Sequence, residues 1–200
     1  MASLCCTASI AAAQDAPLRH VEYAVNGEFD GRPLHTRLVL DLVGTTADRG
    51  ISLDLDEPGA AEPAHLDVDR YGAVHVVDGV TLTREEALLV YFFALGAQNL
   101  TGMDRGDAWS DTGETGVGAE HLTRFRVVRT PGEGRIEVAF TREIEDGYEH
   151  DGYRGRLLYD THKVVPVAFD ARGEIRETQD GSPRMHAVHL TVSLLQDSQP

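Results

Sequence analysis

The feature that most constrains the fold of this chain is a period-two alternation of apolar and polar residues. Val21, Tyr23 and Val25 alternate with His20, Glu22 and Ala24. The same pattern returns at residues 38–42, 51–55, 66–69, 74–76, 125–127, 136–144 and 188–194. Side chains two residues apart in a strand share a face, so each segment has one face for a core and one for water. The pattern predicts a mainly β protein built on an antiparallel sheet.

Turn-forming pairs separate or interrupt these segments. They are Asn26-Gly27, Asp30-Gly31, Tyr71-Gly72, Asp78-Gly79, Pro131-Gly132 and Arg172-Gly173. Glycine, asparagine and aspartate tolerate the backbone angles that tight turns require. The spacing of the pairs suits β-hairpins, and the simplest topology is a meander of about ten strands.

One segment, residues 81–100, breaks the alternation. Thr83 followed by Glu86 has the spacing of a capping box at a helix start, and Gly96 suits a helix end. Residues 87–95 are apolar on nearly every side, so the helix must be covered all round. We expect a buried helix at about 83–96 in the concavity of a strongly curved antiparallel sheet or half-barrel. Residues 14–200 then form a single β-rich domain.

The first 13 residues, MASLCCTASIAAA, are uncharged, small and apolar. Their three closing alanines match a small-x-small cleavage site, although no positive charge precedes the apolar part. The segment predicts a truncated signal peptide and export to the periplasm or the cell exterior; a simple tail is the alternative. Cys5 and Cys6 are the only cysteines, so we expect no disulfide and no cysteine metal site in residues 14–200.

Charge and hydropathy exclude two classes of function. The net charge of −15 opposes binding to nucleic acid, which requires clustered cations. No apolar run is long enough to cross a bilayer, so we expect no transmembrane span. All cations except Lys163 are arginine, which indicates a GC-rich bacterial source more than a function.

Asp111-Thr112-Gly113 resembles the catalytic triplet of the aspartic peptidases. That chemistry needs two carboxylates that share a proton. The flanking Trp109-Ser110 and Glu114 do not match the pattern of that family, and Asp-Thr-Gly is also common in hairpins. We therefore expect no catalytic residue and place Asp111 in an exposed acidic loop after a strand that Trp109 starts. A hydrolase using Asp111 is kept as an alternative.

Histidine and acidic residues give no convincing metal site. His186 and His189 are three apart in a predicted strand and so point to opposite faces. The acidic segment 145–151 lacks the regular oxygen spacing of a calcium loop. We expect no metal and no cofactor, while an ion at 145–151 stays open.

Four aromatic residues are candidates for a binding site. Tyr91, Trp109, Phe125 and Phe140 could line an apolar pocket between the helix and the sheet. The alternative is that they fill the core.

The half of the chain from Gly106 onward resembles uncharacterised exported bacterial domains. Its motifs are Gly-Asp-x-Trp at Gly106, Asp107 and Trp109, and a later Gly-x-x-x-Tyr-Asp at Gly155, Tyr159 and Asp160. Those domains are similar to the half-barrel of periplasmic lipoprotein carriers. The resemblance implies a fold and a compartment and transfers no catalytic residue.

Together these features predict an exported, non-enzymatic binding or scaffold protein. Its partner would be an apolar small molecule or a lipid, held in the concavity of the sheet. Besides the hydrolase, the other alternative is a domain that binds a protein of the cell envelope through an edge strand.

Overall fold

The computed structural model describes residues 17–47, 50–57, 59–69, 71–77, 81–95, 100–114, 120–132, 134–145, 150–179 and 182–198. The proposed signal peptide, Gly96, Asp78-Gly79 and residues 146–149 lie outside them. The described chain forms eleven strands and one helix. They are β1 (Arg19–Phe29), β2 (Arg32–Thr45), β3 (Ile51–Asp56), β4 (Ala64–Val68), β5 (Val74–Val76), α1 (Arg84–Ala94), β6 (Ala108–Glu114), β7 (Glu120–Gly132), β8 (Arg135–Glu145), β9 (His150–Asp160), β10 (Val165–Gln179) and β11 (Ser182–Ser198).

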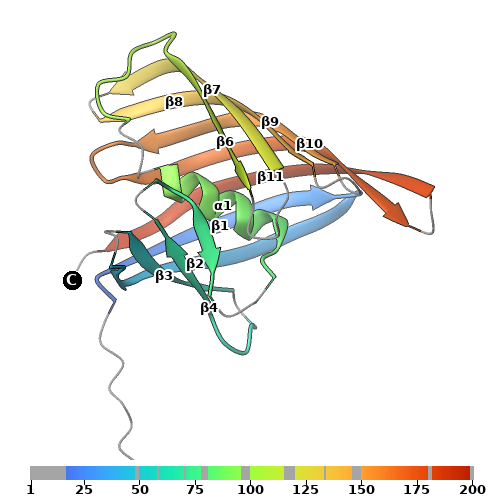
Figure 1. Ribbon diagram of the computed structural model, residues 1–200, viewed down its shortest axis with the longest axis horizontal. Coiled ribbons are helices and arrows are strands. Elements are labelled where there is room, and N and C mark those ends of the chain that lie inside the picture. Colours follow the sequence, from blue (N-terminus) through green and yellow to red (C-terminus); the bar gives the residue numbers. More distant parts are fainter. Residues whose placement is uncertain are drawn as a thin grey trace, which may run out of the picture.

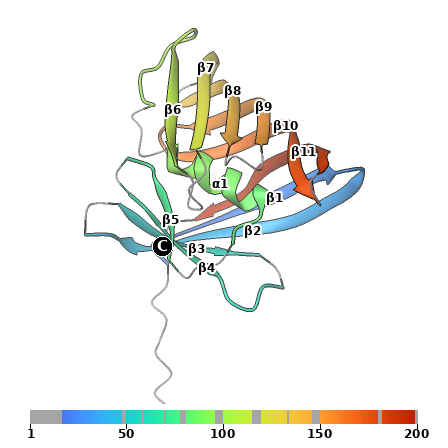
Figure 2. The same ribbon diagram turned by 45° about the vertical axis from the view of Figure 1, so that its right-hand side comes forward.

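All eleven strands belong to one antiparallel sheet, in the order β5-β4-β3-β2-β1-β11-β10-β9-β8-β7-β6. The sheet is open and strongly curved, and α1 lies in its concavity (Figures 1 and 2). The predicted mainly β fold with a curved antiparallel sheet and one helix is therefore confirmed. The topology is two meanders rather than one, because the first strand pairs with the last, with Val25 opposite Val192.

The helix connects the two edges of the sheet, since it follows β5 and precedes β6. It begins as expected: the Thr83 hydroxyl accepts from the Glu86 N–H, and the Thr83 N–H donates to the Glu86 carboxylate at 2.7 Å. It ends at Ala94 with Leu95 as the C-cap, two residues before the expected Gly96. Most of its apolar side chains are buried, as predicted: Leu88, Leu89, Val90, Phe92, Phe93 and Ala94.

Phe92 holds the helix against the sheet. Its ring is fully buried and meets Phe140 of β8 edge-on, with 4.7 Å between ring centroids. It meets Phe169 of β10 in the same way at 4.9 Å. Aromatic side chains bury large apolar areas, and edge-to-face pairs add further attraction. The core therefore lies between α1 and the concave face of the sheet.

Two of the predicted turns lie inside strands. Gly27 lies two residues before the end of β1, and Gly173 lies in the middle of β10. A Cβ atom at Gly27 would collide with the carbonyl oxygen of His189, and one at Gly173 with that of Gly152. These glycines permit a close backbone approach between neighbouring strands rather than a reversal of the chain.

The opposite face of the sheet carries many of the charges. His20 on β1 lies 2.6 Å from the Asp41 carboxylate on β2. Glu137 on β8 lies between Arg129 and Arg156. Among the described residues, no helix has the length and apolarity that a membrane crossing needs.

Candidate functional site

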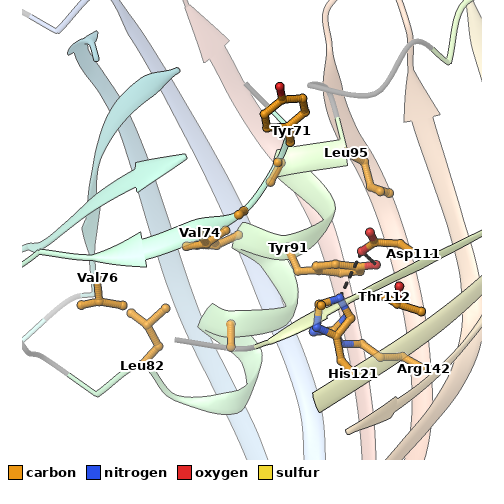
Figure 3. Close-up of a pocket in the computed structure, with 16 residues that line it drawn as sticks. Tyr71, Val74, Val76, Leu82, Tyr91, Leu95, Asp111, Thr112, His121 and Arg142 are labelled. Carbon is orange, nitrogen blue, oxygen red and sulfur yellow. Dashed lines mark hydrogen bonds and ion pairs between the residues drawn. The ribbon is translucent and has the colours of Figure 1, made fainter. Parts of the chain in front are cut away.

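A pocket of about 310 Å³ lies beside the helix, between the two ends of the curved sheet. Its walls come from the turn before β5, from β5 itself, from α1 and from strands β6 to β8 (Figure 3). The volume is at the lower end of the range for small-molecule sites, about 300–1,000 Å³. It suits one small ligand or one chain of a lipid.

Most of the pocket wall is apolar. Val74 and Val76 of β5 lie on the same side of the pocket as Leu82 (Figure 3). Ala87 and Val90 of the helix line the same pocket. Ala94 and Leu95 at the end of the helix continue this wall. The pocket forms because alanines on this side of α1 leave space that larger side chains would fill.

The other end of the pocket is polar and is built by three neighbouring strands. Asp111 of β6 is opposite Thr123 of β7, and Thr123 is opposite Arg142 of β8. His121, two residues before Thr123 in β7, shares its face of the sheet. The register of these hairpins therefore brings Asp111, His121 and Arg142 together on the concave face beside Tyr91 of the helix (Figure 3).

Asp111 accepts from two partners through the same oxygen. The Tyr91 hydroxyl donates to Oδ2 at 2.8 Å, and Nε2 of His121 lies 3.2 Å from it. The hydrogen bond to His121 is the main cause that lowers the pKa of Asp111, and partial burial opposes it. Asp111 is thus an ionised carboxylate at neutral pH. Burial raises the pKa of Tyr91, which keeps its hydroxyl protonated as a donor.

Arg142 is a buried cation without a close carboxylate among the described residues. It is 5% exposed, and its Nη1 donates to the Thr123 hydroxyl at 2.8 Å. Its guanidinium lies 3.7 Å from the centroid of the Tyr91 ring, a cation–π geometry. Burial lowers the pKa of Arg142, while the charge of Asp111 opposes that effect from a longer distance. A guanidinium still remains charged at neutral pH.

One ring nitrogen of His121 has no hydrogen-bond partner among the described residues. Its Nδ1 is buried and makes no hydrogen bond with any part of the chain that the structure describes. Such a group costs about 1–3 kcal/mol when it is left unpaired. Together with Arg142, it gives this end of the pocket unused hydrogen-bonding capacity.

The four aromatic candidates occupy different positions. Tyr91 lines the pocket. Trp109 is half-buried and stacks on Phe125 at 4.8 Å, and Phe125 stacks on Tyr91 at 6.4 Å. Phe140, buried beside Phe125 in the sheet register, packs on the helix. Trp109, Phe125 and Phe140 are thus not among the residues that line this pocket, and their contact with a ligand stays a prediction.

The expectation that Asp111 lies in an exposed loop is wrong. Strand β6 continues to Glu114, so Asp111 faces the concave side with Trp109, two residues before it. Sequence reasoning also missed His121 and Arg142. The signal was present, because Arg142 is two residues after the core residue Phe140 and shares its face of the strand. Part of the acidic segment 145–151 lies outside the described residues, and a bound ion there stays an open question.

The fold and the pocket define a class of protein: an open antiparallel sheet curled round one helix, with a small pocket that is apolar at one end and charged at the other. A solved structure of lipid–protein interactions in lipovitellin is similar to this chain, with a TM-score of 0.50 and 10% identity. The match covers 92% of this chain and 26% of the lipovitellin chain, so this chain spans about a quarter of its length. At that identity the likeness shows the fold alone. No family model matches the chain, and no curated protein matches it in sequence.

Proposed function

We propose that this protein is an exported, non-enzymatic carrier or scaffold that holds one apolar or lipid-like ligand in the pocket beside α1. The observation that carries the proposal is the pocket itself, with an apolar wall formed by β5 and the helix. Apolar ligands bind in such a site because binding removes their surface from water, at about 25 cal/mol per Å². The pocket volume favours a single chain over a lipid with several.

Two further points support the proposal. Lipovitellin, whose fold is similar, is the subject of a structure concerned with lipid–protein interactions. The proposal of export rests on the small-x-small pattern of the first 13 residues.

The geometry gives less support to the alternative of a hydrolase. An aspartic peptidase needs a second carboxylate that shares a proton with the first. The hydrogen-bond partners of the Asp111 carboxylate among the described residues are Tyr91 and His121, and its pKa is lowered rather than raised. The alternative of an envelope partner is favoured by one observation: the sheet is open, with β5 and β6 as edges where another strand could pair.

The test uses N-phenyl-1-naphthylamine, a neutral apolar dye that fluoresces when it leaves water, with 1-dodecanol as a competitor. Ala87 lines the pocket and is exposed, so Ala87→Phe places a ring in the space that the ligand needs. The matched control is Ala61→Phe, which adds the same ring at an exposed site away from the pocket.

We expect saturable dye binding to the wild type and to Ala61→Phe, displaced by 1-dodecanol. Ala87→Phe should weaken it about tenfold or more, which corresponds to about 1.4 kcal/mol. Equal binding by both variants would place the dye outside the pocket and contradict the proposal. So would the absence of binding to a folded wild type.

A further inference from the structure

We propose that the ligand is a single-chain amphiphile with an anionic head group, a carboxylate, which binds to Arg142. This inference rests on the proposed function and adds the chemistry of the head group. The acidic and basic side chains among the described residues that line the pocket are Asp111, His121 and Arg142, and all three lie at the same end. A ligand with an apolar chain and one polar end can therefore enter in a single orientation.

Among the residues that the structure describes, the charged group at that end without an ion pair is the Arg142 guanidinium, on which the Asp111 charge acts only from a longer distance. The Asp111 carboxylate already accepts a hydrogen bond from the Tyr91 hydroxyl at 2.8 Å, and Nε2 of His121 lies 3.2 Å from the same oxygen. The guanidinium of Arg142 donates to the neutral hydroxyl of Thr123 and lies over the face of the Tyr91 ring. A cationic ligand group would be repelled by Arg142, whereas an anionic ligand group would form an ion pair with it.

Burial makes this preference strong. Removing a charged group from water is costly unless it is paired, and Arg142 is 5% exposed. Charge-assisted hydrogen bonds are roughly twice as strong as neutral ones, and a guanidinium matches the two oxygens of a carboxylate. A carboxylate in the pocket therefore gives Arg142 the ion-pair partner that the described residues do not supply.

The position of Arg142 separates the head group from the chain. Arg142 and Asp111 come from β8 and β6, whereas Val74 and Val76 come from β5 at the other edge of the sheet. The apolar chain would lie along Val90 of the helix and Leu82, which precedes the helix, with the carboxylate toward the strands. The volume of about 310 Å³ accommodates one such chain.

The experiment compares dodecanoate with 1-dodecanol, which has the same chain and a neutral head group. Both are titrated calorimetrically, below the concentration at which they form micelles, into the wild type and two variants. Arg142→Met removes the guanidinium and keeps an apolar stem. The matched control Arg124→Met removes an exposed arginine of the neighbouring strand that pairs with Glu143 instead.

We expect the wild type and Arg124→Met to bind dodecanoate about 10- to 100-fold more tightly than dodecanol, as one charge-assisted contact allows. Arg142→Met should lose this preference while its affinity for dodecanol changes little. Equal affinity of the wild type for both ligands would overturn the inference and leave the proposed function standing. If neither ligand binds, both proposals fail.

A second readout keeps the inference testable if Arg142→Met does not fold. The carboxyl carbon of labelled dodecanoate reports its own titration by NMR. Beside a guanidinium, the pKa of the bound carboxyl should be lower than in water. An apolar site without a cation would raise that pKa instead. A raised pKa in the wild type would contradict the contact with Arg142.

Discussion

Replacing Phe92 with alanine should remove a large part of the stability of this protein. Phe92 is fully buried and meets Phe140 and Phe169 edge-on, at 4.7 Å and 4.9 Å. A Phe→Ala change in a core costs about 3–5 kcal/mol, of which aromatic pairs account for about 0.5–1.5 kcal/mol each. With two such pairs we expect a loss of about 4 kcal/mol, against a total of about 5–15 kcal/mol for a typical domain.

The assay is unfolding in urea, followed by the fluorescence of Trp109, the only tryptophan. If the free energy of unfolding falls by about 2 kcal/mol per M of urea, the midpoint of urea unfolding should fall by about 2 M. The control is Met185→Ala, whose side chain is 55% exposed, and it should change stability by less than about 0.5 kcal/mol. A Phe92→Ala midpoint within about 0.5 M of the wild type would refute the packing of the helix against the sheet.

Two further predictions concern the helix start and the pocket. Thr83→Ala removes the hydroxyl that accepts from the Glu86 N–H and should cost about 0.5–2 kcal/mol in the same urea assay; an unchanged midpoint would contradict the cap. Asp111→Asn removes a carboxylate whose pKa is held below the ordinary value of 3.8, mainly by His121. Because the folded-state pKa is depressed, the stability that the carboxylate contributes is present above 3.8 and is lost as pH falls through the lower folded value. The wild type should therefore exceed Asp111→Asn in stability at pH 6, and the difference should shrink below pH 3.8; a difference independent of pH would contradict the hydrogen bonds to Asp111.

Local features of the fold could be predicted from the sequence. The alternation around Val21, Tyr23 and Val25 identifies β1, because the period of a strand is a local property. The helix start at Thr83 follows from capping chemistry that spans three residues. Its burial follows from an apolar surface on nearly every side.

Long-range features could not be predicted in the same way. The pairing of β1 with β11 joins residues that are far apart in the chain, and nothing near Val25 specifies Val192 as its neighbour. Gly27 looks like a turn, because the close approach of His189 that requires it becomes visible only in the assembled sheet.

Only part of the candidate site could be predicted from the sequence. Tyr91 was predicted, and the structure places it in the pocket wall. Asp111 was singled out for a resemblance to a catalytic triplet, whereas its position depends on the continuation of β6. Arg142 has the phase of a core residue, but its approach to Asp111 depends on the register of two hairpins across Thr123.

The measurement that tests the central claim most directly locates a bound chain in the protein. Intermolecular NOEs can be recorded between 1-dodecanol and methyl groups of the protein in solution. The account predicts contacts from the alkyl chain to the methyl groups of Leu82 and Val90, which line the pocket. Contacts confined to exposed apolar residues such as Met185 and Leu195 would show that the ligand binds elsewhere and would contradict the account.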